Sequence, residues 1–366
     1  MKLTIRVILT VLCAAIILCM PFFLSSPNKL TAETKSAEDF ENDVSEDGDS
    51  EVIDLDDLLG FFVSAAYAEE ETVVESLDLF IPDEWKLPLD ISAPPRPNPA
   101  KYTENGYEDQ SIRVTVETRE MEGCKVDVAF IQIADASQLR TAVAGTVQNK
   151  KTNTFKAIAQ NVNPVVAMNG DLYTQKAEKK TFEVRMTEAI RAKTNNMKDI
   201  LIIDDLGDFH LFIRSEGLHK DDDPYYLTQA KAEGRKIVNA ITFGPALVKD
   251  GEMVDQSWNE ENYSYNPNGK EPRSAIGQTG PLSYVMVIVE GRGDSPGASF
   301  RTLAQIMYDL GCTQAYNLDG GNSAEMLMYE SDGENIKYHF QGDQEGGDRS
   351  HKDIIYFGTA VPESEW

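Results

Sequence analysis

The stretch that most constrains this chain lies late in the sequence, where residues 315–326 spell Ala-Tyr-Asn-Leu-Asp-Gly-Gly-Asn-Ser-Ala-Glu-Met. A short apolar run ends at Asp319, and the two glycines that follow permit a tight turn that most other residues disfavour. The run itself is typical of a brief buried strand. An Asp-Gly pair between two strands is most often a hairpin turn. A carboxylate at a strand end, next to backbone without side chains, is also suited to approach a bound molecule closely.

The residues before this stretch predict a strand, a helix and a second strand in one crossover unit. Residues 284–290 form an apolar run, and a glycine-rich segment follows. Ser299 can cap a helix over residues 300–310, and Gly311 occupies its C-terminal cap position. One helix face repeats at i, i+3, i+4 and i+7, through Leu303, Ile306, Met307 and Leu310. In such a unit Asp319 lies near the carboxyl end of its strand, where ligands tend to bind.

Elsewhere the apolar pattern predicts many strands and few helices. Strands are expected over residues 112–116, 126–134, 165–168, 200–203, 209–213 and 237–243. Helices are expected over residues 135–144, 152–161 and 225–236. The predicted fold class is therefore α+β, with a mixed, largely antiparallel sheet and a few packed helices.

The net charge of −27 is concentrated in one part of the chain. Between Glu33 and Asp78 there are seventeen acidic residues and one lysine, which is the composition of a disordered linker. A surplus of acid argues against nucleic acid as a partner, because phosphate binding requires Lys and Arg. A proline-rich spacer over residues 82–99 follows this acidic segment.

The N-terminus carries a hydrophobic run with positive charge before it and acid after it. Residues 7–24 are just long enough to cross a bilayer, so we expect a signal-anchor with an extracellular C-terminal domain. A cleaved signal peptide, which would make the protein secreted, is the alternative. The expected domains are 1–25 as the anchor or signal peptide, 26–100 as a largely disordered acidic and then proline-rich linker, and 101–366 as the folded domain.

Cysteine and histidine spacing indicates neither a disulfide framework nor a zinc site. Only Cys124 and Cys312 belong to the folded part, and two buried free thiols are favoured over one bridge. The histidines lack the short spacings of zinc hydrolases, so we expect no metal and no cofactor. They are His210, His219, His339 and His351.

Polar and glycine residues interrupt apolar runs in five places, each of which alone is more often a turn or a surface pair. These places are 169–171, Arg273 with Gly277, 291–294, 319–323 and 349–353. Arg273 is distinctive because it lies between a proline and the small apolar run Ala-Ile-Gly, near the core. A half-buried arginine needs an anionic partner, which is either a carboxylate or the phosphate of a ligand.

Taken in order, these blocks resemble a known family. The chain carries Asn-Gly-Asp-Leu-Tyr at 169–173, Pro-Arg-Ser-Ala-Ile-Gly at 272–277 and Asn-Leu-Asp-Gly-Gly-Asn-Ser at 317–323. Shorter blocks fall between them, at 244–251, 289–292 and 309–311. From about residue 112 to 361 the sequence resembles the phosphodiester glycosidase domain family. That family includes the mannose-6-phosphate uncovering enzyme and bacterial exopolysaccharide biosynthesis proteins.

The resemblance implies an extracytoplasmic hydrolase that cleaves the glycosidic bond of sugar-1-phosphodiesters on cell-surface polysaccharide or glycoconjugates. Its partners are then a carbohydrate or sugar-phosphate substrate and, through the N-terminal segment, a membrane. An oxocarbenium-like centre requires a carboxylate, and a phosphate leaving group requires a cation. Asp319 is the expected carboxylate, with Asp171 or Glu325 as its partner. Arg273 is expected at the phosphate, together with Arg292 or Arg349.

Substrate contacts are expected from the same blocks: Asn169, Gly170, Arg292, Gly320, Gly321 and Ser323. Attack by Asp319, activation of water by Asp319, and binding alone are all compatible with these residues. A non-catalytic module that binds anionic cell-wall or exopolysaccharide polymers is the main alternative function. A surface scaffold held off the membrane by its linker is a third.

Overall fold

A computed structural model describes residues 79–146, 151–171, 182–192, 198–213, 216, 233–254, 268–329, 335–346 and 349–366. The chain divides into two compact units, Met1–Glu75 and Ser76–Trp366, and all described residues belong to the second. The expected anchor at residues 7–24 lies outside the described residues, as do residues 225–232 of the helix expected over 225–236, and residues 233–236 are not helical. Within the described ranges, no helix has the length and apolarity needed to cross a bilayer.

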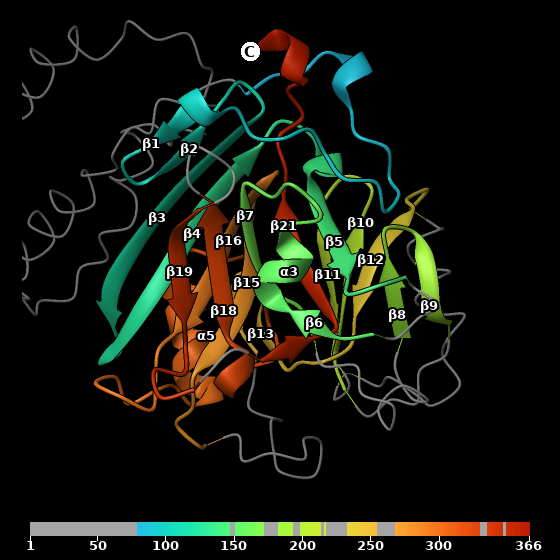
Figure 1. The fold of residues 1–366 in the computed structure, drawn as a ribbon. Coiled ribbons are helices and arrows are strands. Elements are labelled where there is room, and N and C mark those ends of the chain that lie inside the picture. Colours follow the sequence, from blue (N-terminus) through green and yellow to red (C-terminus); the bar gives the residue numbers. More distant parts are fainter. Residues whose placement is uncertain are drawn as a thin grey trace, which may run out of the picture. The chain divides into compact units, whose positions relative to one another are not determined.

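A nine-stranded sheet forms the largest element (Figure 1). Its strand order is β1 (Tyr102–Thr103), β2 (Gly106–Glu108), β3 (Ile112–Met121), β4 (Cys124–Ile133), β16 (Ser283–Val289), β15 (Arg273–Gly280), β17 (Gln314–Asn317), β13 (Ala246–Lys249) and β14 (Glu252–Met253). All of its strand pairs are antiparallel. The two long strands β3 and β4 confirm the strands predicted over residues 112–116 and 126–134.

Two five-stranded sheets and one two-stranded pair complete the strand framework, again with antiparallel pairing. One sheet runs β19 (Ile336–Gln341), β18 (Glu325–Tyr329), β7 (Val166–Asn169), β21 (Asp353–Phe357) and β5 (Leu139–Val143). The other runs β11 (Phe209–Phe212), β10 (Ile200–Asp204), β12 (Ile237–Ile241), β8 (Phe182–Arg185) and β9 (Glu188–Ala192). The pair is β20 (Ser350–His351) with β6 (Asn153–Thr154). The molecule is thus mostly β, with several antiparallel sheets where one mixed sheet was expected.

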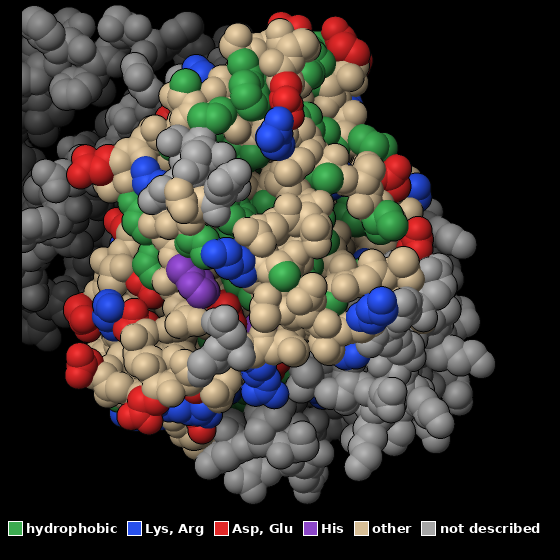
Figure 2. All heavy atoms as spheres, viewed as in Figure 1, with side chains coloured by type: hydrophobic (Ala, Val, Ile, Leu, Met, Phe, Trp, Pro, Cys, Tyr) green, Lys and Arg blue, Asp and Glu red, His purple; other side chains and the backbone are tan. Residues whose placement is uncertain are grey.

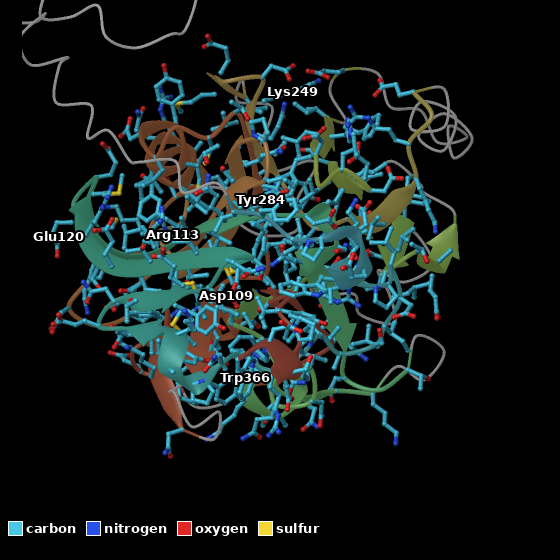
Figure 3. The ribbon with its side chains drawn as sticks, turned by 90° about the horizontal axis from the view of Figure 1, so that it is seen from above. Asp109, Arg113, Glu120, Lys249, Tyr284 and Trp366 are labelled. Atoms are coloured by element: carbon cyan, nitrogen blue, oxygen red, sulfur yellow. The ribbon has the colours of Figure 1, made fainter. Side chains whose placement is uncertain are left out.

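The three larger sheets meet around the ring of Tyr284, which lies in the interior (Figure 3). Its ring centroid is 5.4 Å from that of Phe209 in β11 and 5.2 Å from that of Phe357 in β21. The Tyr284 hydroxyl donates to the carbonyl of Gly207 at 2.9 Å, so the buried phenol is satisfied. One aromatic cluster therefore joins a strand from each sheet.

The crossover predicted before Asp319 is present. Helix α5 (Phe300–Asp309) begins at Ser299, whose Oγ accepts from the backbone N–H of Thr302 at 3.1 Å. Gly311 follows the helix with φ +77°, as a left-handed C-terminal cap requires. Strands β16 and β17 both pair antiparallel with β15, so they run in the same direction with one strand between them. Asp319 then follows two residues after the end of β17.

Two helix predictions fail or are only partly met. Residues 135–144 form a single 3-10 turn, η5 (Ala136–Gln138), and then strand β5. Asp135 makes a capping box with Gln138, but the next residues pair with β21. The helix expected over residues 152–161 is shortened to α3 (Phe155–Ala159), which covers one face of the β18–β7–β21 sheet (Figure 1).

The proline-rich segment packs on the folded unit from residue 79 onward, although the domain was expected to start near Lys101. Short 3-10 turns interrupt it at η3 (Asp83–Trp85) and η4 (Pro99–Lys101). Its main anchor is the buried side chain of Arg140, which donates to the carbonyls of Pro88, Asp90 and Ser92 at 3.0, 2.6 and 2.8 Å. Cys124 and Cys312 are free and buried, as predicted.

Candidate functional site

The loop after β17 is held by hydrogen bonds to its backbone. The carbonyl of Asp319 accepts from Asn169 Nδ2 at 2.7 Å and from Ser274 Oγ at 2.6 Å. The N–H of Asp319 donates to the carbonyl of Gly170 at 3.3 Å. The ends of β7 and β15 therefore fix the backbone of the predicted carboxylate. A short 3-10 turn, η8 (Gly321–Ser323), follows it.

Internal packing accounts for several residues that were expected to contact substrate. Asn169 is fully buried, and its Oδ1 accepts from the N–H of Glu325 at 3.1 Å while its Nδ2 donates to carbonyls. A Cβ on Gly320 would lie 2.7 Å from the carbonyl oxygen of Pro272. Gly321 has φ +61°, and a Cβ there would lie 3.3 Å from Arg292 Nη2. These three residues build the loop, and their own contacts explain why other residue types would not fit.

The carboxyl of Asp319 is partly buried at the start of this loop. Burial raises its pKa above the usual value. A hydrogen bond with the buried Ser323 side chain and the positive charges of Arg349 and His351 oppose that rise, whereas Asp171 adds to it. Asp319 and Asp171 thus interact electrostatically.

Asp171 is part of a buried acidic cluster around Arg185, a residue that sequence reasoning missed. Arg185 Nη2 is 3.1 Å from Asp171 Oδ1 and 2.7 Å from Asp353 Oδ2, and Arg185 Nη1 is 3.1 Å from Glu183 Oε2. All four side chains are at most 1% exposed. Gly170 makes room for this cluster, because a Cβ there would lie 2.4 Å from Asp353 Oδ1. Three carboxyl groups therefore share one guanidinium.

The cluster retains protons because it has more acid than base. Burial raises the pKa of Glu183 well above its usual value, and the neighbouring Asp171 raises it further. Burial also raises the pKa of Asp353, to about 7, although Arg185 pulls it down. Lys198 adds a second cation beside Asp171, Glu183 and Asp319, with its pKa lowered by burial and raised by these acids. Carboxyls with raised pKa values beside a cleavable bond are typical of acid–base catalysis.

Glu325, the second predicted partner of Asp319, starts strand β18 and contacts two histidines. Its Oε1 is 3.1 Å from His351 Nε2, and its Oε2 is 3.1 Å from His339 Nε2. Burial disfavours the charged form of Glu325, but the hydrogen bonds to His339 and His351 outweigh burial and lower the pKa. Glu325 is therefore an ionised acceptor for both rings.

Arg273 and Arg292 lie beside the glycine turn and are engaged by other groups. Arg273 is buried, donates to the carbonyls of Ala298 and Gly269 at 2.9 Å each, and stacks over the ring of Phe300 at 4.2 Å. Arg292 binds carboxylates and an amide: Glu271 at 2.6 Å, Asp343 at 2.8 Å and Asn322 at 2.5 Å. The contacts of both guanidinium groups fix the surrounding loops.

The residues missed from the sequence are Arg185, Glu183 and Lys198, whereas Asp353 lies in the block 349–353, which was singled out without a role for this residue. Glu183 and Arg185 alternate with apolar residues in β8, a pattern that usually places charges on a solvated face. Here all four residues of the strand are buried. One feature of the sequence could have indicated that these charges are buried: Glu183 and Arg185 lie within a short run that begins at Phe182 and ends at Met186.

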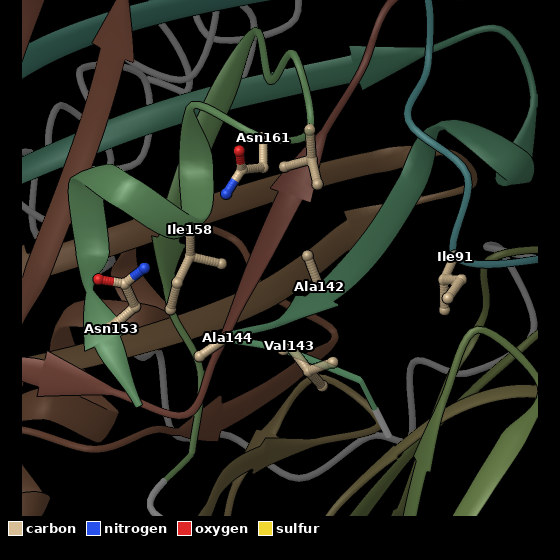
Figure 4. A pocket seen from close by; sticks show the side chains of 9 residues that line it. Ile91, Ala142, Val143, Ala144, Asn153, Ile158 and Asn161 are labelled. Atoms are coloured by element: carbon tan, nitrogen blue, oxygen red, sulfur yellow. The ribbon is translucent and has the colours of Figure 1, made fainter. Parts of the chain in front are cut away.

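A pocket elsewhere in the described part of the chain lacks the charged side chains of a catalytic site. A pocket of about 230 Å³ lies between β5 and α3, lined by Ala142, Val143, Ile158, Asn161 and others (Figure 4). It has no titratable side chain and none of the predicted site residues. On the face shown in Figure 2, acidic and basic side chains are interspersed and do not form one basic patch. Among the described residues, no group of three His, Cys, Asp or Glu is arranged to hold a metal ion.

Comparison with known proteins gives a family and a fold. The phosphodiester glycosidase family model matches residues 138–357. The catalytic domain of zebrafish N-acetylglucosamine-1-phosphodiester alpha-N-acetylglucosaminidase, auto-inhibited by its pro-peptide, is 14% identical, with 74% of this chain and 87% of that chain covered at a TM-score of 0.51. This likeness shows the fold alone. None of the curated proteins matches the sequence significantly.

Two further solved structures are similar at lower scores. A hypothetical protein from Synechocystis is 15% identical, with 68% of this chain and 62% of that chain covered at a TM-score of 0.48. An exported protein from Burkholderia pseudomallei is 13% identical, with 64% and 74% covered at a TM-score of 0.41. The family match spans more than half of the chain and includes Asn169, Asp171, Arg273 and Asp319. The chain therefore belongs to the phosphodiester glycosidase family.

Proposed function

We propose that this chain is a hydrolase that cleaves the glycosidic bond of sugar-1-phosphodiesters on cell-surface polysaccharide or glycoconjugates, outside the cytoplasm. Family membership supports the reaction class. The observation that carries the proposal is the position of Asp319. Its partly buried carboxyl lies at the start of a loop whose backbone is fixed by Asn169 and Ser274, and the charges of Asp171, Arg349 and His351 act on it.

Cleavage of this glycosidic bond requires a carboxylate near the anomeric carbon more than it requires an acid that protonates the leaving group. Cleavage breaks the bond between the anomeric carbon and the phosphate oxygen, and the electron pair leaves with the phosphomonoester. Water supplies the new hydroxyl on the sugar. A developing oxocarbenium ion is stabilised by an adjacent anion, the role that we give to Asp319. Because burial raises the pKa of Asp319, activity should fall as the pH decreases and this carboxylate is protonated.

We assign the phosphate to Arg349 and Lys198, and we assign loop positioning to Arg273. Arg349 is exposed and acts on the charge of Asp319, and Lys198 interacts with the same carboxyl. Arg273 has its guanidinium on backbone carbonyls and on an aromatic ring. Arg292 is likewise placed as a support for the turn at Gly321. Ser323 orients the Asp319 carboxyl.

The test is turnover of a sugar-1-phosphate alkyl diester by the purified chain. We expect free sugar and an alkyl phosphate, and in ¹⁸O-labelled water the label should enter the sugar. Label in the phosphate would indicate phosphorus–oxygen cleavage and contradict the proposal. A neutral aryl glycoside, which has no phosphate, is the control that tests whether the enzyme requires the phosphate group. Binding of the diester without turnover would favour a non-catalytic module for anionic polymers.

Asp319→Asn tests the assigned carboxylate. We expect kcat to fall by about 10²-fold or more, because the neutral amide cannot stabilise the developing positive charge. The matched control is Asp309→Asn, which changes an exposed aspartate at the end of α5. Full activity of Asp319→Asn would show that another group carries the reaction.

A further inference from the structure

The Glu325 carboxylate fixes the orientation of two imidazole rings. Each of its oxygens is 3.1 Å from one Nε2, that of His351 on one side and that of His339 on the other. The two rings differ in their surroundings. The His351 side chain is 5% exposed and that of His339 is 28% exposed. Only one of the two rings is therefore enclosed by the protein.

His351 belongs to the neighbourhood of Asp319. The side-chain amide of Asn169 joins Asp319 to Glu325, because it donates to the carbonyl of Asp319 at 2.7 Å and accepts from the N–H of Glu325 at 3.1 Å. His351 also lies two residues before Asp353, whose carboxylate occupies the space against Gly170. When His351 carries a proton, its charge acts on the Asp319 carboxyl and lowers the pKa of that carboxyl.

We infer that His351 is the general base of the hydrolysis proposed above, and that Glu325 is its positioning residue. This inference rests on the proposed function. The neutral imidazole takes a proton from water as the water oxygen bonds to the anomeric carbon. The bond from that carbon to the phosphate oxygen breaks, and the phosphomonoester leaves with the electron pair. The imidazolium then releases its proton to solvent.

The proposed hydrolysis requires a base that activates water more than it requires an acid at the leaving group. A phosphate is a good leaving group, so protonation of the leaving oxygen contributes little. Water is a poor nucleophile and gains from a histidine whose other nitrogen is held by a carboxylate. The groups that contact His351 are Glu325 from β18 and the ring of Phe155 from α3, at 5.7 Å between centroids, and Asp319 interacts with it electrostatically. Arg349 and His339 complete the charged surroundings, acting on Asp319 and Glu325.

His351→Gln and His339→Gln form a matched pair of variants. Glutamine places an amide N–H near the position of Nε2, so each variant keeps a donor to Glu325 and each removes a basic nitrogen. We expect His351→Gln to lower kcat by about 10²-fold or more with a change in KM below about threefold. His339→Gln should keep kcat within about threefold of the wild type. Equal losses in both variants, or activity retained in His351→Gln, would overturn the inference.

Two further measurements separate base catalysis from structural support. Imidazole added to His351→Ala should restore part of kcat, because the small base can enter the space left by the ring. In Glu325→Gln, kcat should fall while KM changes by less than about threefold, because a neutral amide holds the imidazole of His351 less firmly than the carboxylate does. Absence of rescue together with an unchanged kcat in Glu325→Gln contradicts the role of His351. Absence of turnover by the wild-type chain instead removes the proposed function, and the inference with it.

Discussion

Gly170 shows how one missing side chain permits a buried ionic cluster. Its backbone N–H donates to the carbonyl of Asp353 at 3.1 Å, and the carboxylate of Asp353 occupies the position where a Cβ would lie. Because Asp353 also binds Arg185 at 2.7 Å, any displacement of this carboxylate disturbs the whole cluster. The residue between the two predicted polar side chains Asn169 and Asp171 is therefore fixed by packing.

Gly170→Ala should destabilise the protein and reduce activity. A methyl group 2.4 Å from Asp353 Oδ1 forces the carboxylate or the strand to move, and overpacking of this kind costs about 2 kcal/mol. The control is Gly280→Ala at the end of β15, where no heavy atom lies within 4 Å of the new Cβ. Urea unfolding of the two variants gives the comparison. Equal stability of the two variants would mean that the cluster around Arg185 adjusts to the new methyl group without loss of stability.

Asp319 and Asp171 each follow the end of a buried strand that was predicted from the sequence, and the two interact electrostatically. Asn169 was predicted to contact substrate, whereas its amide bonds the backbone of Asp319 and of Glu325. Arg185 could not be found, because two of its three acidic partners, Asp171 and Asp353, come from segments far from it in the sequence. A charged residue in a short strand looks solvated until those partners are known.

Helix α5 is the element that connects β16 to the strand before Asp319. Its start was predictable because Ser299 is a local signal, and its side chain accepts from Thr302 N–H at 3.1 Å. Strand β5 was predicted as a helix for a related reason. The capping box at Asp135 is real, but pairing with β21 takes over after one turn. Local signals therefore identify where a helix begins, whereas tertiary pairing decides how far it continues.

Ser299→Ala should lower the free energy of unfolding by about 1 kcal/mol, because the first turn of α5 loses its cap. In a unit of this size such a change lowers Tm by roughly 2–4 °C. Ser283→Ala is the control, since its exposed hydroxyl caps no helix and donates only to the carbonyl of Pro281. Differential scanning calorimetry compares them. A Tm for Ser299→Ala no lower than that of Ser283→Ala would show that tertiary packing alone fixes the start of α5.

At the scale of the whole molecule, the acidic cluster makes stability depend on pH. The pKa of Asp353 is raised to about 7 and that of Glu183 is raised well above its usual value, in both cases mainly by burial. An unfolded chain ionises these groups near pH 4. Between about pH 4 and 7 the folded state therefore binds more protons, and stability is lost as the pH rises.

Glu183→Gln should flatten this dependence. The amide keeps an oxygen acceptor for Arg185, which lies 3.1 Å from Glu183 Oε2, and has no proton to lose. We expect the variant to gain stability relative to the wild type as the pH rises from 5 to 8, measured by urea unfolding. Glu188→Gln changes an exposed glutamate in the neighbouring strand β9 and should keep the wild-type slope. If the stability of Glu183→Gln depends on pH as steeply as that of the wild type, the folded state binds the additional proton at another group.

The segment before the domain shows why a boundary is hard to read from composition. Residues 79–98 have the prolines of a free spacer, and nothing local indicates that they pack. Their anchor is Arg140, 1% exposed, which was expected on a helix. Its guanidinium donates to three carbonyls of this segment, to the carbonyl of Ser137 and to the Tyr356 hydroxyl. Extended, proline-rich backbone offers unpaired carbonyls, and one buried arginine can satisfy several of them.

Arg140→Lys should therefore release this segment while the charge is kept. An ammonium group has three donors without the fork geometry of a guanidinium, so at least two of the five acceptors lose their partner, at a cost of about 2 kcal/mol. We expect a lower Tm and faster proteolytic cleavage between residues 79 and 98. Arg96→Lys is the control, because Arg96 makes only an exposed ion pair with Glu363 at 3.1 Å. Unchanged protection of the segment in Arg140→Lys would mean that its contacts with Ser137, Asn163 and Thr187 are sufficient to hold it in place.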